Sequence, residues 1–354
     1  MTKKLGPAMA GLAILAAVAV SARADPFYRL ESAITLKGAS PAWDYLAFDP
    51  TRSYLFIDRR AAGVTVFDVA AGQVMGQIAQ SEGANATTLI PEFDRGYTTN
   101  GDGSTTSFEL SSLKTIARTA LGKSADAAFY DSKTKQLAFM MGDEKQITLV
   151  DARTGLVSGR IATQSESLEA AAADGRGGLF VAERDRDAVL KVDMVGRRIV
   201  AEWKTAPCRQ PTGLAFDRAD RRIFVGCRGA KPVLAVLNAD TGKLVAVLKI
   251  GRGNDGVVYD PEGRRVFTSN GLDANLVIFD QQGPDAYGLS QAVTTRPIAR
   301  TMAFDPKSKK VYLVTAEGVV DPAKPVNTEA GPFYPNHYFP DTFTLLTYAP
   351  VGTK

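Results

Sequence analysis

Short apolar runs recur along almost the whole chain, and they come in groups whose first run ends in an acidic residue and a polar turn. Examples of this first run are YLAFDP (45–50) and GVVYDP (256–261). A second apolar run follows a charged turn, as in RIFVGC (222–227). No helical period is sustained, so the pattern predicts β-strands throughout. The aspartates that close the first runs are Asp49, Asp131, Asp174, Asp217, Asp260 and Asp305.

These groups repeat with a mean spacing of about 43 residues. A third run, such as VTVFDVAAG (64–72), and a fourth, such as KLVAVLKIG (243–251), bring each group to four strands. Four strands in a repeat of this length are typical of a β-propeller blade. An irregular copy, TTLIPEFD (87–94), brings the count to seven blades. Six blades is the alternative if that copy is misread.

The two ends of the repeat array complement each other. The last repeat lacks a fourth strand, because TFTLLTYAP (342–350) nearly ends the chain, whereas AITLKG (33–38) is a spare strand at the start. A ring closed by the N-terminal strand would remove exposed sheet edges. We therefore expect an all-β, seven-bladed β-propeller of four-stranded blades, forming a single domain over residues 25–354.

The first 24 residues have the features of a signal peptide. Lys3 and Lys4 precede an apolar stretch, Ala8 to Val20, and Ala22-Arg23-Ala24 supplies small residues for cleavage. The stretch is shorter than a bilayer span, although an uncleaved anchor is the alternative. We expect a periplasmic or secreted protein that has no membrane span after cleavage.

Charge argues against a nucleic-acid partner. The chain has 42 Lys and Arg against 38 Asp and Glu, and the leader removes three basic residues and no acidic one, leaving 39 against 38. A basic footprint over the whole surface is therefore absent from the mature chain. We expect a monomer whose partner is a protein, a peptide or a small molecule.

One position of the repeat gathers candidate functional residues. Loops that enter the first strand and leave the second converge on one mouth of the propeller channel, and the residue five before each closing aspartate lies there. Its members are Asp44, Asn85 (in the irregular copy), Asp126, Glu169, Thr212, Asp255 and Arg300. One interpretation is that the aspartates at these strand starts accept backbone N–H bonds from the next blade, which would tighten the ring.

The other interpretation is a ligand site, and its carboxylates allow two kinds of chemistry. Asp44, Asp126, Glu169 and Asp255 could bind calcium, a cation that prefers several oxygen ligands. Close carboxylates could also form a general acid–base pair, with Asp126, Glu169, Asp255 and Arg300 as the catalytic candidates. Calcium is the one cofactor that the sequence suggests.

Two further groups belong to the same face. The loops after second strands carry Arg59, Arg60, Arg184, Arg186 and Arg228, which either clamp an anionic ligand or are solvated loop charges. The longest irregular segment, 317–343, is rich in proline and aromatic residues and holds the only histidine, His337. This segment is either an aromatic lid or partner-docking loop, or a plug across the channel.

The only cysteines, Cys208 and Cys227, are expected to form a disulfide in an exported protein. Pairing of the hairpin from Asp217 and Arg222 places Cys227 opposite Thr212. Two cysteines and one histidine far apart argue against a zinc site.

Three stretches also resemble a known family. YTTN (97–100) and FTSN (267–270) end equivalent second strands and resemble the motif of the YVTN-repeat, YncE-like seven-bladed propellers of bacteria. The stretch 208–228 resembles them as well. The resemblance implies the propeller fold and export, but it implies no single reaction and transfers no site residue.

We therefore expect an exported binding or scaffold protein that docks a peptide, protein or small ligand at its polar face, because no nucleophile–base set is evident. The alternative is a cation-assisted, lactonase-type hydrolase or lyase that uses the mouth carboxylates. A third option is a subunit of an exported redox complex whose cofactor lies on another chain.

Overall fold

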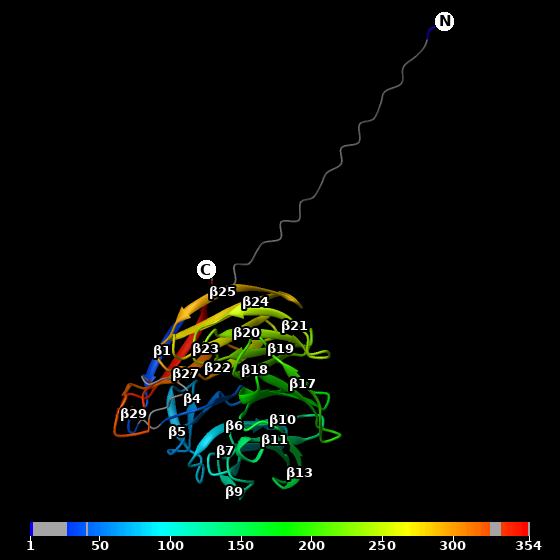
Figure 1. Ribbon diagram of the computed structural model, residues 1–354. Coiled ribbons are helices and arrows are strands. Elements are labelled where there is room, and N and C mark those ends of the chain that lie inside the picture. Colours follow the sequence, from blue (N-terminus) through cyan, green and yellow to red (C-terminus); the bar gives the residue numbers. More distant parts are fainter. Residues whose placement is uncertain (3–26, 40–41, 326–333, 353–354) are drawn as a thin grey trace.

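The computed structural model describes residues 1–2, 27–39, 42–325 and 334–352, which form seven four-stranded antiparallel sheets arranged as a propeller (Figure 1). The prediction of an all-β, seven-bladed β-propeller is confirmed. The predicted signal peptide lies outside the described residues, apart from the first two, and stays a prediction.

Six of the blades consist of four strands that are consecutive in the sequence. Blade 1 contains β2 (Leu46–Asp49), β3 (Tyr54–Asp58), β4 (Val64–Asp68) and β5 (Gln73–Gln77). Blade 2 contains β6 (Ala84–Ile90), β7 (Arg95–Asn100), β8 (Ser104–Glu109) and β9 (Thr115–Ala120). Blade 3 contains β10 (Ala128–Asp131), β11 (Gln136–Met141), β12 (Gln146–Asp151) and β13 (Val157–Ala162). Blade 4 contains β14 (Leu168–Ala173), β15 (Gly178–Glu183), β16 (Ala188–Asp193) and β17 (Arg198–Lys204). Blade 5 contains β18 (Pro211–Asp217), β19 (Arg222–Cys227), β20 (Val233–Asn238) and β21 (Leu244–Lys249). Blade 6 contains β22 (Asn254–Asp260), β23 (Arg265–Asn270), β24 (Asn275–Gly283) and β25 (Ala286–Thr294).

The seventh blade joins both ends of the described chain. It contains β26 (Met302–Phe304), β27 (Val311–Thr315), β30 (Thr344–Val351) and β1 (Phe27–Thr35), in the order β1-β30-β27-β26. The N-terminal strand thus pairs antiparallel with β30 as the outermost strand. It begins earlier than the expected 33–38, because pairing with β30 continues past an irregularity between Leu30 and Ser32.

The repeated aspartates are turn signals. The Asp49 carboxylate accepts a hydrogen bond from the backbone N–H of Thr51 at 2.8 Å. Asp217 accepts the equivalent bond from Ala219 at 2.9 Å. Aspartate favours turns because its side chain can bond to the backbone two residues on. The aspartate at the end of the first strand therefore forms the turn into the second strand.

The irregular copy in blade 2 replaces this turn with a short 3₁₀ helix, η1 (Pro91–Phe93). The first strand ends at Ile90, which pairs with Arg95 as Asp49 pairs with Tyr54 in blade 1. Asp94 follows η1 and binds the backbone N–H of Ser111 instead. The structural equivalent of the closing aspartates is therefore Ile90, not Asp94. The other short helices, η2 (Gly142–Glu144) and η3 (Arg184–Arg186), follow second strands.

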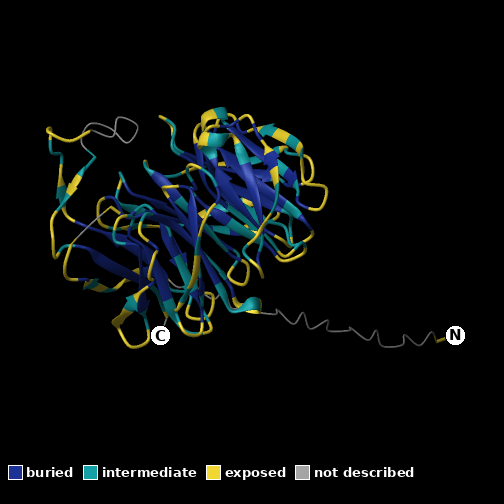
Figure 2. Ribbon diagram, turned by 90° about the horizontal axis from the view of Figure 1, so that it is seen from below, coloured by how far each residue is buried: buried dark blue, intermediate teal, exposed yellow. Residues whose placement is uncertain are grey.

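The inner strands are buried and the outermost strands are largely exposed (Figure 2). Phe180 and Phe224, on the second strands of blades 4 and 5, are fully buried. Each packs on an aromatic ring of the following blade, with centroids 5.2 Å apart for Phe180 and Phe216 and 5.1 Å apart for Phe224 and Tyr259. Such pairs stabilise beyond the area that they bury. The blades are therefore held together by interlocking aromatic residues.

Candidate functional site

The candidate ring position coincides with an irregularity in the first strand. In blades 2, 5 and 6 the pairing of the first two strands skips one residue, which is Asn85, Thr212 or Asp255. In blade 4 the skipped stretch contains Glu169. A β-bulge re-aims the side chain of the extra residue and often lies at a barrel rim or active site. The bulge explains why these side chains leave the sheet surface.

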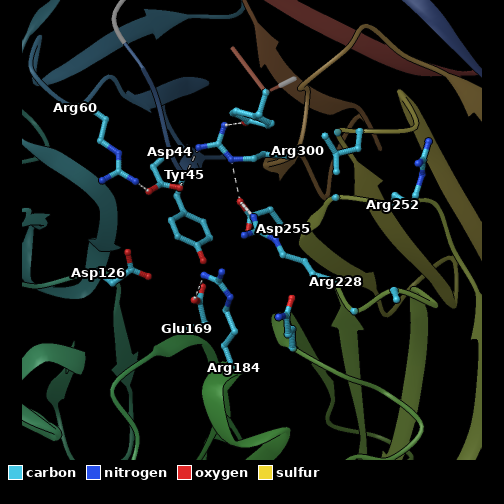
Figure 3. Close-up of a pocket in the computed structure, with 17 residues that line it drawn as sticks. Asp44, Tyr45, Arg60, Asp126, Glu169, Arg184, Arg228, Arg252, Asp255 and Arg300 are labelled. Carbon is cyan, nitrogen blue, oxygen red and sulfur yellow. Dashed lines mark hydrogen bonds and ion pairs between the residues drawn. The ribbon is translucent and has the colours of Figure 1, made fainter. Parts of the chain in front are cut away.

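Five of the seven ring residues line one cavity of about 350 Å³. They are the charged members, and Figure 3 shows them gathered from different blades around Tyr45. Three of the arginines proposed from loops after second strands line the same cavity. The ring residues are Asp44, Asp126, Glu169, Asp255 and Arg300, and the arginines are Arg60, Arg184 and Arg228.

The two neutral ring residues do not line the cavity. They bond to the next blade instead, but as donors to backbone carbonyls rather than as the acceptors that the structural interpretation expected. The Asn85 side chain donates to the carbonyl of Ala125 in the next blade at 2.9 Å. The Thr212 hydroxyl donates to the carbonyl of Asn254 in the next blade at 2.9 Å. These two positions therefore join adjacent blades, whereas the charged positions face the cavity.

On the side of blades 5, 6, 7 and 1 the charges are closely paired. The Asp255 carboxylate contacts the guanidinium groups of Arg228 at 2.5 Å and Arg300 at 2.9 Å. Asp44 pairs with Arg60 and lies 3.7 Å from Arg300. Burial opposes the charge of Arg300, but Tyr334 and the two carboxylates outweigh it and raise its pKa. We call this set the paired side: Asp44, Arg60, Arg228, Asp255 and Arg300.

On the side of blades 3 and 4 the pairing is incomplete. Glu169 lies 3.3 Å from Arg184 and accepts a hydrogen bond from the Ser167 hydroxyl at 3.0 Å. The Asp126 carboxylate makes no hydrogen bond or ion pair with any described residue. Burial and the nearby Glu169 carboxylate raise the pKa of Asp126 well above its usual range. We call Asp126, Glu169, Arg184 and Tyr45 the open side.

Tyr45 was missed from the sequence, and it occupies the centre of the mouth (Figure 3). Burial, and next the Asp126 carboxylate, raise the pKa of its hydroxyl. The hydroxyl makes no hydrogen bond with a described residue. Tyr45 also lines a narrower hollow of about 170 Å³ deeper in the channel. The side chain therefore separates the mouth from the channel below.

A signal for Tyr45 was present in the repeat. It directly follows a ring residue, and the other blades hold small residues at that position: Ala86, Ala127, Ala170, Gly213, Gly256 and Thr301. Six small side chains leave room along the axis, and one tyrosine fills it. Gln210 and Arg252 were not predicted from the sequence either, and they line the cavity from the loops before blades 5 and 6.

Three of the sequence candidates lie elsewhere. Arg59 is buried, donates to the carbonyl of Ala39 at 2.5 Å and covers the ring of Phe343. Arg186 pairs with Glu202 at 3.2 Å. His337 is exposed, with Nδ1 2.8 Å from Nζ of Lys324. None of the three lines the mouth cavity.

The described part of the segment 317–343 forms a small hairpin at the rim of the mouth. β28 (Gly318–Val319) pairs with β29 (His337–Tyr338). Tyr338 packs on Trp43 with ring centroids 5.1 Å apart. The Tyr334 hydroxyl lies 3.1 Å from Arg300 and lines the cavity. This hairpin contributes a wall to the mouth, while residues 326–333, with Phe333 among them, lie outside the described residues.

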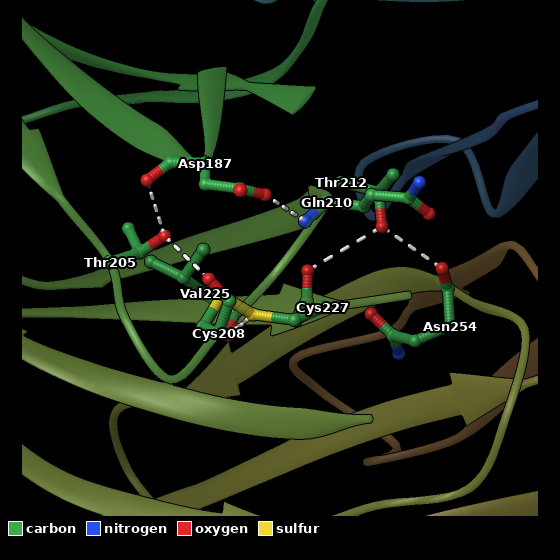
Figure 4. Close-up of a disulfide and its surroundings, with 9 residues drawn as sticks. Asp187, Thr205, Cys208, Gln210, Thr212, Val225, Cys227 and Asn254 are labelled. Carbon is green, nitrogen blue, oxygen red and sulfur yellow. Dashed lines mark hydrogen bonds between the residues drawn. A yellow bond between two sulfur atoms is a disulfide. The ribbon is translucent and has the colours of Figure 1, made fainter. Parts of the chain in front are cut away.

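Cys208 and Cys227 form a disulfide with their Cα atoms 5.5 Å apart (Figure 4). Cys227 pairs with Pro211 rather than with Thr212, because Thr212 is the bulged residue. The Thr205 hydroxyl donates to the carbonyl of Cys208 at 2.9 Å. The disulfide therefore ties the loop before blade 5 to the strand end that carries Arg228.

The four carboxylates do not gather as metal ligands. Among the described residues no group of three or more His, Cys, Asp or Glu side chains could hold a metal ion. Guanidinium groups lie against three of the four carboxylates. The geometry favours ion pairs over a calcium cage, which needs six to eight oxygens.

No helix among the described residues is long and apolar enough to cross a membrane. Neither the protein-family models nor the curated proteins include a match to this chain.

Solved structures do resemble the fold. They include a chain of "Crystal Structure of Mitotic Checkpoint Complex" (14% identity, TM-score 0.69, covering 88% of this chain and 95% of that chain). Another is Kuenenia stuttgartiensis hydrazine synthase (16%, TM-score 0.66, covering 78% and 94%). A third is the WD40 repeats of RRP9 (10%, TM-score 0.71, covering 92% and 99%). At these identities the likeness shows the fold alone, a seven-bladed propeller like that of WD40 proteins.

Proposed function

We propose that this protein is an exported binding protein whose propeller holds a small polar ligand in the mouth cavity. The observation that carries the proposal is the cavity of about 350 Å³ lined by side chains from six of the seven blades. Ligand sites usually measure 300–1,000 Å³ and combine a hollow with a few placed polar groups. A propeller fold that commonly serves binding is consistent with this role.

Export and family are part of the same proposal. The disulfide suits an oxidising compartment, and residues 1–24 have the sequence features of a signal peptide. YTTN and FTSN end equivalent second strands, β7 and β23, as the YVTN-repeat resemblance requires. We therefore assign the chain to the periplasmic or secreted YVTN-type propellers as a proposal that cleavage at Asp25 and secretion can test.

The binding proposal is tested by blocking the cavity. Ala230 is exposed and lines its rim, so Ala230→Trp should fill the entrance without disturbing the core. Thermal unfolding of the mature protein would be followed with a panel of sugars, amino acids, nucleosides, dicarboxylates and diamines. A ligand at 100 times its Kd adds about 2.7 kcal/mol to the stability.

A shift in the wild type that is lost in Ala230→Trp supports the proposal. Ala71→Trp, at an exposed turn that does not line the cavity, is the matched control and should keep the shift. A panel without any shift, or shifts of equal size in Ala230→Trp, would contradict a ligand site in the mouth.

One observation favours a second function, a hydrolase or lyase of lactonase type. Asp126 and Glu169 line the same cavity, and burial together with the Glu169 carboxylate raises the pKa of Asp126, so the two could serve as a general acid and a general base. Turnover of a panel of lactones and esters should then disappear in Asp126→Asn and Asp255→Asn proteins that still fold. Unchanged turnover in both variants would exclude this chemistry.

A further inference from the structure

We infer that the ligand of the mouth cavity carries an ammonium group, which binds to Asp126 beside Glu169 and Tyr45. This inference rests on the proposed binding function and adds the chemical class of the ligand. It depends on which charged groups of the cavity already have partners in the folded protein.

Every guanidinium group that lines the cavity lies against a carboxylate. Arg60 pairs with Asp44, and Arg184 lies 3.3 Å from Glu169. Arg228 and Arg300 share Asp255. Arg252 binds Asp273 at 2.7 Å at the outer edge. An anionic ligand would therefore compete with an existing carboxylate for each of these guanidinium groups.

Asp126 is the exception among the carboxylates. It lines the cavity, but no described residue donates a hydrogen bond to its carboxylate or pairs with it. An ionised carboxylate that is withdrawn from water without a partner is costly to the fold, so burial favours the neutral form of Asp126 until a cation is supplied. Its position at the cavity wall, on the other side of Tyr45 from Asp255 (Figure 3), lets a ligand provide the missing charge.

The surroundings of Asp126 favour a cation. The charged and titratable groups that act on it are Glu169, Asp44, Arg60 and Asp255, with the hydroxyl of Tyr45 close to all four carboxylates. Three of these four charged groups are acidic. An ammonium group has three donors and no acceptor, and Asp126, Glu169 and the Tyr45 hydroxyl offer acceptors for them. The Tyr45 ring adds a surface that attracts organic cations.

An ammonium group suits this position better than a metal ion does. Calcium and magnesium need at least six oxygen ligands, and the described residues provide no group of three acidic, cysteine or histidine ligands. A single ammonium group needs only the few acceptors that the open side presents.

Binding should be linked to proton release. Burial and the nearby Glu169 carboxylate raise the pKa of Asp126 and so favour its protonated form in the empty protein, whereas a bound ammonium group favours the ionised carboxylate. The proton passes to the buffer, so the affinity should rise as the pH is raised above about 4. A ligand carboxylate would accept a hydrogen bond from protonated Asp126, and its affinity would fall over the same range.

Four compounds of equal chain length separate these cases by titration calorimetry. They are cadaverine, 5-aminopentanoate, glutarate and 1,5-pentanediol. We expect the two amines to bind at least tenfold more tightly than glutarate and pentanediol. Repeating the titration at several pH values, in buffers of different ionisation enthalpy, measures the number of protons released, which should be above zero for the amines.

The variant Asp126→Asn should lower the affinity for the amines at least tenfold and abolish proton release. Asp143→Asn makes the same chemical change in blade 3 at an exposed residue that does not line the cavity, so it should bind as the wild type does. Thermal unfolding checks that both variants fold.

Two results would overturn the inference while leaving the binding function in place. The first is tighter binding of glutarate or pentanediol than of the amines. The second is that the amines do not bind, while a ligand of another class does bind and its binding is lost in Ala230→Trp. Amine binding that is unchanged in Asp126→Asn would place the ammonium group elsewhere and contradict the inference as well. If no compound of any class binds, the proposed function itself fails.

Discussion

The paired side and the open side of the mouth are built from equivalent positions of the repeat, yet they differ in electrostatics. Asp255 and Asp126 occupy the same ring position in blades 6 and 3, but Asp255 contacts two guanidinium groups and Asp126 contacts none. The cause lies in the neighbouring blades. Arg300 is the next ring residue after Asp255, and Arg228 follows the second strand of blade 5.

Asp126 has different neighbours. The ring residue before it is Asn85, whose side chain is bonded to a backbone carbonyl, and the ring residue after it is Glu169. The second strand of blade 2 ends at Asn100 and is followed by glycine rather than arginine. In a propeller, therefore, the blades on either side of a carboxylate decide whether it is an ion-pair partner or a free group.

The largest effect should come from removing the carboxylate of the paired side. Asp255→Asn leaves Arg228 without its carboxylate partner and Arg300 with only the longer contact to Asp44. Loss of one partner from a buried pair costs about 3 kcal/mol or more. Urea unfolding at pH 7 measures this loss. The identical change Asp126→Asn is the matched comparison, and equal losses in the two variants would contradict the distinction between the sides.

The disulfide should contribute about as much to the free energy of unfolding as the Asp255 ion pairs do. Cys208 and Cys227 are 19 residues apart, and a loop of this size is stabilised by about 3 kcal/mol through restriction of the unfolded chain. The double variant Cys208→Ala with Cys227→Ala should lose that amount in urea unfolding. Dithiothreitol should have no further effect on this variant. A loss well below 1 kcal/mol would indicate that the loop before blade 5 is held by its other contacts.

Removing the carboxylate of the open side should have the opposite effect on stability, and this effect should depend on pH. The pKa of Asp126 is raised by burial and by Glu169, so above about pH 4 the unfolded chain releases this proton while the folded protein keeps it. Asp126 therefore lowers the free energy of unfolding as the pH rises from about 4 towards 7. Asp126→Asn should lack this loss and be the more stable protein at pH 7.

The measured quantity is the difference in unfolding free energy between wild type and Asp126→Asn at several pH values. Glu183 acts in the same range, because burial raises its pKa to about 7. Its contribution is present in both proteins and cancels in the difference. A difference that does not change with pH would show that Asp126 is ionised in the folded protein.

The sequence was sufficient for the position of the ring but not for its bonding. Counting five residues back from a turn aspartate found the ring residue in six blades. In blades 4, 5 and 6 the bulge lies at that constant distance before the aspartate that forms the turn. In blade 2, η1 lies between the end of the first strand and Asp94, so counting five residues back from Asp94 does not reach the ring position. Asn85 was found only as the nearest polar residue. The correct reference, Ile90, has no polar side chain to reveal it.

The pairing of charges could not be predicted in this way. Aligning the repeats compares each blade with the others, whereas ion pairs such as Asp255 with Arg228 and Arg300 join different positions of adjacent blades. Tyr45 was overlooked because attention was on charged residues, although it is the one large residue where six blades hold small ones. Steric variation at a repeat position is thus as informative as charge.

The smallest effect should come from the hydroxyl of Tyr45, and it would sharpen the definition of the open side. This hydroxyl bonds to no described residue, so Tyr45→Phe should change the free energy of unfolding by less than about 0.5 kcal/mol. Tyr97 provides the matched control, because its buried hydroxyl donates to the carbonyl of Ala152 at 3.0 Å. Tyr97→Phe should cost about 1 kcal/mol in urea unfolding.

Equal losses in the two tyrosine variants would mean that the Tyr45 hydroxyl has a partner in the empty protein. The open side would then be closed by the protein itself rather than left for a ligand. If Tyr45→Phe is neutral for stability but weakens amine binding, the hydroxyl acts only on the ligand. That result would distinguish the two sides by what they bind: the paired side binds its own chain, and the open side binds the ammonium group.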